Sequence, residues 1–381
     1  MIRRSWHLIL LCLLVLLHTS AMAAQPKTWG YLGWWLPQSW QQLPLKQLDR
    51  LLFFDLKVNA DGAIVDRHGW PEQWADLQKS VQQNRVPLDL VLTLFEPDDF
   101  NRLFASVDAM KQLVSEATTL AATAGVAGLQ IDFEIYDLAQ PQPIENFRTF
   151  LRMLSGQLRQ MSPPRNLSVF FPVSAEPSLY DAEALKMADQ VVLQGYDVHW
   201  RASKAAGPVA PLKGSDNWHW EKMVARGETL GIEREKMLLG FPLYGYEWQV
   251  KGNKPRSATL GTGVATSFYP ISPEFRGEMQ FSIQDRVRQY GATHDPTSGS
   301  SYYQFINGDG QFVEGWFEDW WSLGKKSDYL TAERIGGIAF FLIGYDDGQL
   351  VRFFLQERKP YSQPETSVPK SSDSPPAADV R

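Results

Sequence analysis

The feature that constrains this chain most is a series of eight apolar segments of strand length between residues 28 and 344. They are TWGYLGWW (28–35), LDRLLFFDLKV (48–58), PLDLVLTLF (87–95), AGLQIDFE (127–134), NLSVFFPV (166–173), ADQVVLQGYD (188–197), KMLLGFPLYG (236–245) and IGGIAFFLIG (335–344). Between most of them, apolar residues recur at helical spacing, for example over 70–83 and 100–125. Buried strands that alternate with amphipathic helices are typical of parallel sheets. The order therefore predicts an α/β fold, a (β/α)8 TIM barrel.

A doubly wound open sheet is the alternative arrangement of the same elements. Such a sheet usually carries a glycine-rich phosphate-binding loop after its first strand, and no such loop follows residues 28–35. One connection is long, since residues 246–312 contain no clear helix but much Gly, Ser, Thr and Tyr. A structureless loop of this length is rare. We therefore expect a small α+β insertion between strands 7 and 8, which forms one wall of a cleft at the carboxyl face of the barrel.

The two ends of the chain differ from the rest in composition. Residues 1–23 combine an arginine pair, an apolar run and a final Ala-Met-Ala, which predicts a signal peptide and a periplasmic or secreted protein. The single cysteine, Cys12, falls inside this segment, so the mature chain should hold no disulfide or cysteine nucleophile. Residues 362–381 are rich in Pro and Ser and should be disordered. Residues 24–361 remain for the barrel.

The charge of the chain narrows the partners that it can bind. Loss of Arg3 and Arg4 with the signal peptide changes the net charge from −6 to −8. An acidic exported protein is a poor ligand for nucleic acid or anionic lipid, so we expect neither partner and no stable membrane insertion. The histidines outside the signal peptide are His68, His199, His219 and His294. None of them pair at the spacing of three or four residues that would favour a metal site.

Two acidic residues stand out at the end of the fourth apolar segment. Because side chains alternate along a strand, Gln130, Asp132 and Glu134 point the same way, which in a barrel is the interior. Glu134 lies at the carboxyl end, where barrel active sites form. Burial and a neighbouring like charge raise the proton affinity of a carboxyl group, as a general acid requires. Solvated residues just past the strand, or a structural ion pair, are the alternative interpretation.

The sixth segment ends in QGYD and offers a second candidate group. Gln194 and Tyr196 share a face, and Asp197 follows at the mouth of the barrel. A tyrosine hydroxyl beside two carboxylates is suited to hold a substrate carbonyl. A core tyrosine with one satisfied hydroxyl is equally compatible with this pattern.

These segments resemble glycoside hydrolase family 18, the chitinase family, in order and spacing over residues 28–357. GLQIDFE (128–134) resembles the strand-4 motif D-G-x-D-x-D-x-E, and QGYD (194–197) resembles the strand-6 motif M-x-Y-D. The strand-7 and strand-8 segments of the family are similar to GFPLYGYEW (240–248) and GGIAFF (336–341). The segments GPVAP (207–211), WFED (316–319) and LIGYDDGQL (342–350) resemble the branch that includes spore-cortex-lytic enzymes and related chitinase-domain proteins. That branch acts on N-acetylglucosamine linkages, several members on peptidoglycan.

The resemblance implies a role for each matching residue. Glu134 would be the general acid and base, and Asp132 would orient the acetamido group of the substrate. Tyr196 would hydrogen-bond the acetamido carbonyl, with Asp197 supporting that geometry. In this family the nucleophile is the substrate's own acetamido oxygen, which gives an oxazolinium intermediate and retention of configuration. No metal and no organic cofactor are implied.

The chain departs from the family pattern at several positions. Ala127 and Gln130 replace the first two motif aspartates, and Gln194 replaces the motif methionine. Phe341 stands where a tryptophan normally forms the floor of the sugar subsite, and TLFE (93–96) stands in place of the strand-3 S-x-G-G pattern. Gln130, Gln194 and Phe341 remain substrate-binding candidates. The changes indicate a substrate other than crystalline chitin.

Aromatic residues near the strand ends are further substrate-binding candidates. Trp34, Tyr244 and Trp248 lie where their rings could stack on sugar faces. Aromatic side chains of this size more often serve packing, which is the alternative.

Together these features predict an exported, monomeric glycosidase that hydrolyses β-linked N-acetylhexosamine glycans such as peptidoglycan, chitin-like chains or exopolysaccharide. A catalytically inactive carbohydrate-binding protein on the same barrel is the alternative. Lectins of this fold usually lose one of the acids at the positions of Glu134 and Asp132, and both are present here. A scaffold or inhibitor protein is a third interpretation, but it would give the acids and Tyr196 no reason to converge.

Overall fold

The computed structural model describes residues 25–136, 140–175, 179–275, 277 and 279–357. The predicted signal peptide (1–23) and the predicted disordered tail (362–381) lie outside these residues. In the part of the chain that is described, no helix has the length and apolar character needed to cross a membrane.

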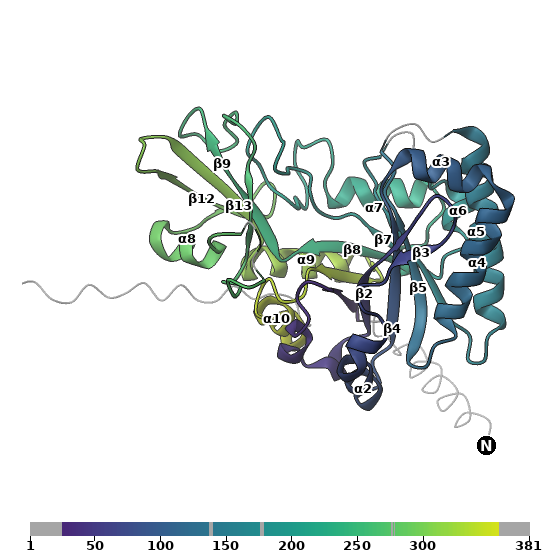
Figure 1. Ribbon diagram of the computed structural model, residues 1–381. Helices are drawn as coiled ribbons and strands as arrows, with labels where there is room; N and C mark the ends of the chain where they lie inside the picture. Colours follow the sequence, from purple (N-terminus) through teal and green to yellow (C-terminus); the bar gives the residue numbers. More distant parts are fainter. Residues whose placement is uncertain (1–24, 137–139, 176–178, 276, 278, 358–381) are drawn as a thin grey trace, which may run out of the picture.

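A closed barrel of eight parallel strands forms the centre of the molecule (Figure 1). Its strands are β1 (Lys27–Gly33), β2 (Arg50–Val58), β4 (Leu88–Leu94), β5 (Val126–Phe133), β6 (Asn166–Phe171), β7 (Gln190–Leu193), β8 (Met237–Pro242) and β14 (Gly337–Phe341). They pair in the order β1-β14-β8-β7-β6-β5-β4-β2, and β2 pairs with β1 to close the barrel. The predicted (β/α)8 barrel is confirmed, since each apolar segment overlaps one of these strands. A short strand, β3 (Ile64–Asp66), pairs with β2 in the antiparallel direction.

Helices cover the outside of the barrel. They are η1 (Ser39–Gln42), η2 (Leu45–Gln47), η3 (Glu72–Trp74), α2 (Ala75–Asn84), α3 (Pro97–Ala105), α4 (Val107–Ala121), α5 (Pro141–Gln160), α6 (Ala182–Leu185), α7 (Trp220–Thr229), η4 (Arg234–Lys236), α9 (Trp320–Ala332) and α10 (Gln349–Glu357). The helical pattern over 100–125 is divided between α3 and α4. The break lies at Ser106, whose hydroxyl accepts the Ala109 N–H at 3.2 Å and so caps the start of α4.

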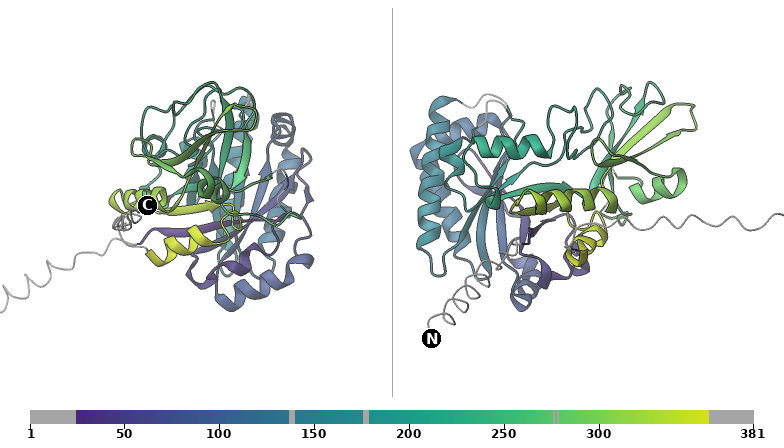
Figure 2. Two further views of the ribbon diagram at one scale, coloured as in Figure 1. Left: turned by 90° about the vertical axis from the view of Figure 1, so that its left-hand side faces the viewer. Right: turned by 180° about the vertical axis from the view of Figure 1, so that it is seen from behind.

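A separate lobe is inserted between β8 and β14. It consists of β9 (Tyr244–Val250), β10 (Val264–Ser267), α8 (Ile283–Tyr290), β11 (Thr293–Asp295), β12 (Ser300–Ile306) and β13 (Phe312–Phe317). The strands form an antiparallel sheet in the order β10-β9-β13-β12-β11. The sheet spans 244–317, slightly more than the predicted 246–312. Figures 1 and 2 show this lobe on the side of the barrel opposite to α3, α4 and α5.

Two apolar cores hold the fold together. The larger lies between the barrel and its covering helices. The second includes barrel-interior residues such as Tyr31 and Leu238 and continues to Tyr246 and Trp316 of the lobe sheet. Burial of aromatic side chains in a shared core resists separation of the two parts. The shared core therefore holds the lobe against the mouth of the barrel.

The amino ends of the barrel strands carry a compensated charge. Asp89 of β4 is fully buried and forms an ion pair with Arg50 of β2. The Asn166 amide donates a further hydrogen bond to Asp89 at 3.2 Å. In TIM barrels this end serves stability, while the carboxyl end carries the chemistry.

Candidate active site

A cavity of about 690 Å3 opens at the carboxyl ends of the barrel strands. It is lined by Phe54, Asp132, Glu134, Tyr136, Ser174, Gln194, Tyr196, Asp197, Trp200, Tyr244 and Phe341. Phe54 lies within β2, Tyr244 begins β9 of the lobe, and the others lie at the ends of β5 and β14 or in the loops that follow β5, β6 and β7. Three of them are acids, and none of these described lining residues is basic. The cavity therefore combines carboxyl groups with aromatic walls.

Strand β5 brings Asp132 and Glu134 to the same cavity, as the alternation of side chains predicts. Asp132 is 2% exposed, and its Oδ1 has no hydrogen-bond partner among the described residues. A buried carboxylate oxygen without a partner is costly, and such atoms are rare outside functional sites. Glu134 follows the last residue of β5 and is partly exposed to the cavity. Its backbone N–H donates to the carbonyl of Leu94, the last residue of β4, at 3.0 Å, so the neighbouring strand still holds its backbone in place.

The protons of these two acids are held tightly. Burial raises the pKa of Asp132 well above its usual value, and the charges of Glu134 and Asp55 raise it further. Burial also raises the pKa of Glu134 to about 7, against a hydrogen bond from Tyr136 that lowers it, and the charge of Asp197 adds to the rise. A carboxyl group with a pKa near neutrality can keep its proton for a leaving group and later take one back.

A third acid, Asp197, follows β7 and is held by the lobe. Its backbone adopts a left-handed conformation with φ of 59°. Its Oδ1 accepts hydrogen bonds from the hydroxyls of Tyr244 at 2.6 Å and Tyr246 at 3.1 Å. Burial raises the pKa of Asp197 to about 6, and these two hydrogen bonds lower it. The neighbouring Tyr196 is buried and lines the same cavity.

Aromatic rings form the floor of the cavity around Phe341. The ring of Tyr196 lies nearly parallel to it, at 5.6 Å between centroids and 24° between planes. Tyr31 and Phe54 meet Phe341 edge-on, at 5.5 Å and 5.4 Å. Phe341 thus provides the apolar surface that the sequence predicted at this position.

Gln130 does not line the cavity. It is fully buried one layer below Asp132. Its Oε1 accepts the Tyr31 hydroxyl at 2.8 Å, and its Nε2 donates to Ser168 Oγ at 3.2 Å. The structure therefore places this predicted substrate-binding residue inside the barrel, where it links β1, β5 and β6.

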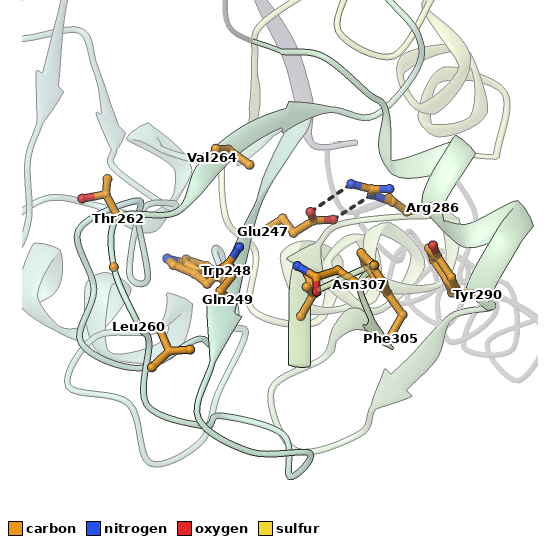
Figure 3. A pocket seen from close by; sticks show the side chains of 13 residues that line it. Glu247, Trp248, Gln249, Leu260, Thr262, Val264, Arg286, Tyr290, Phe305 and Asn307 are labelled. Carbon is orange, nitrogen blue, oxygen red and sulfur yellow. Dashed lines mark hydrogen bonds and ion pairs between the residues drawn. The ribbon is translucent and has the colours of Figure 1, made fainter. Parts of the chain in front are cut away.

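Two predicted aromatic residues also lie elsewhere. Trp34 stacks on the ring of His68, with centroids 4.0 Å apart, and lines a different cavity of about 550 Å3. Trp248 is 1% exposed and borders a cavity of about 560 Å3 on the lobe (Figure 3). In that lobe cavity, Glu247 accepts two hydrogen bonds from Arg286, at 2.8 Å and 3.0 Å. Neither tryptophan is brought to the cavity that holds Asp132 and Glu134.

The sequence reasoning missed three aromatic residues of the site, of which Phe54 lies within β2 and the other two lie in loops. Tyr136 and Trp200 line the cavity and are 46% and 49% exposed. The Tyr136 hydroxyl lies 2.6 Å from Glu134 Oε2 and 3.2 Å from Gln194 Oε1. Tyr136 and Trp200 lie within three positions of an acid at a strand end, and this proximity in the sequence was the available signal.

Comparisons with known proteins agree on one family. The sequence pattern of the family described as "Glycosyl hydrolases family 18" matches residues 27–346. A cortical fragment-lytic enzyme from Bacillus anthracis is 24% identical over 318 residues, which cover 78% of this chain. The matched region spans 65% of the length of that relative, slightly less than two thirds.

Solved structures with this fold include members of the same family. A family 18 chitinase from Cycas revoluta, in a complex with allosamidin, superposes with a TM-score of 0.72 at 20% identity, covering 87% of this chain and 99% of its own. The spore cortex-lytic enzyme SleL from Bacillus megaterium superposes with a TM-score of 0.65 at 18% identity, covering 87% of this chain and 73% of its own. These likenesses show the fold. The family match over residues 27–346, most of the chain, establishes that the chain belongs to glycosyl hydrolases family 18.

Proposed function

We propose that this chain is an exported glycosidase that hydrolyses β-linked N-acetylhexosamine glycans by substrate-assisted, retaining catalysis. The observation that carries the proposal is the buried, unpartnered Oδ1 of Asp132 beside Glu134, whose pKa is raised to about 7. Oδ1 of Asp132 offers an acceptor for which the described residues supply no donor, and an acetamido N–H would provide one. Export rests on the composition of residues 1–23.

In the first step, Glu134 donates its proton to the glycosidic oxygen as the bond between that oxygen and C1 breaks. The acetamido oxygen of the same sugar attacks C1 and forms an oxazolinium ring, while the leaving alcohol departs with the proton of Glu134. Asp132 accepts the acetamido N–H, and this hydrogen bond and the developing positive charge favour its ionised form, which stabilises that charge. In the second step, ionised Glu134 removes a proton from water, which attacks C1 and reopens the ring. Two inversions at C1 give overall retention.

The other cavity residues position the sugar. The Tyr196 hydroxyl is the donor proposed for the acetamido carbonyl. Asp197 is held by two tyrosines on one of its oxygens, so that its carboxylate keeps a single orientation beside Tyr196. Phe341 supports the apolar face of the ring, and Gln194 offers an amide to its hydroxyls. Tyr244 acts through its hydrogen bond to Asp197 and also forms part of the cavity wall.

The chemistry of the cavity favours an uncharged sugar at the cleavage point. Its three acids and the lack of a basic group among the described lining residues would repel a carboxylate-bearing sugar there. An N-acetylglucosamine unit is neutral and fits this environment. The names of the relatives, a cortical fragment-lytic enzyme and a chitinase, support glycans that contain this sugar.

Digestion of defined glycans tests the proposal. Purified peptidoglycan, chitooligosaccharides and poly-N-acetylglucosamine are incubated with the enzyme in parallel, and product masses and anomeric configuration are recorded. We expect cleavage of at least one glycan at N-acetylglucosamine with retention. A de-N-acetylated version of the cleaved glycan should stay intact, because it lacks the acetamido nucleophile. Equal cleavage of both versions would exclude substrate assistance, and binding without cleavage would identify a lectin.

A further inference from the structure

Tyr136 connects the ends of two barrel strands across the cavity mouth. Its hydroxyl reaches Glu134 Oε2 at 2.6 Å, just after β5, and Gln194 Oε1 at 3.2 Å, just after β7. The intervening strand β6 separates these two strand ends in the barrel. Tyr136 is 46% exposed, so packing alone does not account for its placement.

We infer that Tyr136 and Gln194 form a clamp that fixes Oε2 of Glu134 and leaves Oε1 to meet the glycosidic oxygen. Tyr136 is thus a positioning residue, and this role rests on the proposed function of Glu134 as the proton donor. A phenol has one proton to donate, and the shorter contact assigns it to the carboxylate. With the Gln194 amide turned so that its NH2 group faces the phenol, Gln194 then donates to the hydroxyl oxygen from the other side. This arrangement gives a physical reason for a glutamine at position 194.

The clamp also sets the proton affinity of Glu134. A hydroxyl that donates to a carboxylate stabilises its ionised form and lowers its pKa. In this site burial dominates and raises the pKa of Glu134, and the Tyr136 hydrogen bond limits that rise. Burial and the charge of Glu134 raise the pKa of Tyr136 well above its usual range, so its hydroxyl stays protonated and remains a donor. The clamp therefore lets Glu134 release its proton in the first step as well as regain it in the second.

The test removes the hydroxyl and follows the pH dependence of the reaction. Because a general acid works only while protonated, the alkaline limb of kcat/KM reports the pKa of Glu134. Tyr136→Phe should move this limb to higher pH by about one unit, since a hydrogen bond to a charged group is lost. Gln194→Met should move it in the same direction by less. The double variant should add little to Tyr136→Phe, because both changes act on one contact.

Tyr290→Phe is the matched control. Tyr290 lies on α8 in the lobe and is 36% exposed. This variant also removes one partly exposed tyrosine hydroxyl, but Tyr290 lines the lobe cavity and not the cavity that holds Glu134. We expect its pH profile to match that of the wild type. If Tyr136→Phe lowers kcat/KM by one factor at every pH and leaves the limb in place, Tyr136 is merely structural and the clamp is wrong.

A titration without substrate separates this inference from the proposed function. In protein labelled with 13C at the glutamate carboxyl carbons, comparison with Glu134→Gln identifies the Glu134 signal. Its midpoint should rise in Tyr136→Phe and stay unchanged in Tyr290→Phe. If the midpoint rises although the enzyme cleaves no glycan, the contact holds and the proposed activity is wrong. If the midpoint does not move, the clamp is overturned whatever the activity.

Discussion

Two glutamates, one in the barrel mouth and one in the lobe, have opposite surroundings. Glu134 and Glu247 each accept a hydrogen bond from a tyrosine hydroxyl, at 2.6 Å and 2.8 Å. Glu247 also accepts hydrogen bonds from Nε and Nη2 of Arg286, at 2.8 Å and 3.0 Å (Figure 3). Glu134 has no cation among the described lining residues of its cavity and lies near two further acids.

The difference separates a carboxyl group suited to stabilise the fold from one suited to transfer a proton. Burial raises the pKa of Glu247, but the hydrogen bonds and charge of Arg286 and the hydrogen bond from Tyr303 oppose that rise. The oxygens of Glu247 are occupied by these three donors, and the bidentate pair with Arg286 is suited to hold α8 against the lobe sheet. Glu134 lacks this compensation, so its proton remains available at neutral pH. The same residue type thus serves two purposes according to the presence of a cation.

Removal of the charge at each glutamate should give the largest contrast. Glu134→Gln cannot donate a proton, so kcat on a cleaved N-acetylated oligosaccharide should fall by about 10²–10⁴-fold or more. Glu247→Gln should change kcat by less than about threefold, because this residue lies outside the cavity. Binding of the oligosaccharide by Glu134→Gln should survive, as measured by calorimetry. Comparable losses of kcat in the two variants would contradict the division of roles.

Asp132→Asn tests the uncompensated acid next to Glu134. The positive oxazolinium would lose its counter-charge, and kcat should fall by about 10²–10³-fold, the range found when one electrostatic contact to a transition state is removed. The melting temperature should not fall, because a buried oxygen without a partner becomes part of a neutral amide. Unchanged turnover would rule out Asp132 as the residue that orients the acetamido group.

The lobe pair should show the reverse pattern, a loss of stability with little loss of turnover. Arg286→Ala leaves Glu247 buried without a cation and should lower the free energy of unfolding by about 3 kcal/mol, the cost of breaking such a pair. Combining Glu247→Gln with Arg286→Met should restore most of this loss, since neither charge then remains. Denaturant unfolding of the single and double variants measures both effects. A double variant as unstable as Arg286→Ala would show that the packing of Arg286, not its charge, holds α8.

A smaller effect should appear in the pH dependence of stability. The pKa of Glu134 is about 7 in the folded protein against an ordinary value of 4.5, so the folded state holds this proton more tightly than the unfolded state. The resulting stability is complete below the ordinary pKa and is lost as the pH rises through 7. Glu134→Gln cannot lose a proton, so it should gain in melting temperature relative to the wild type between pH 5 and 8. A difference that stays constant with pH would argue against the raised pKa.

The sequence predicted the barrel and most of its mouth for clear physical reasons. The alternation of side chains identified Asp132 and Glu134, and the next matching strand end identified Tyr196 and Asp197. Alternation specifies the face on which a side chain lies but not its distance from the mouth of the barrel. Gln130 precedes Asp132 by two residues on β5 and so lies about 7 Å further into the barrel. Its amide is therefore satisfied by Tyr31 and Ser168, far from a substrate.

Residues in the loops were harder to predict. Tyr136 and Trp200 follow strand ends, where no periodicity specifies the direction of a side chain. Trp248 lies four residues beyond Tyr244 on β9, or about 13 Å along the strand, and so leaves the cavity for the lobe core. Trp34 turns toward His68, a contact between distant segments that a local pattern does not contain.

The join between lobe and barrel limits how this architecture can be recombined. One residue, Leu243, separates β8 from β9, and the first strand of the lobe supplies both hydroxyls that orient Asp197. A lobe transplanted from another scaffold would have to reproduce these two hydroxyls, or the recipient would lose the orientation of Asp197. Barrel and lobe therefore have to be varied together, because the orientation of Asp197 depends on side chains from both.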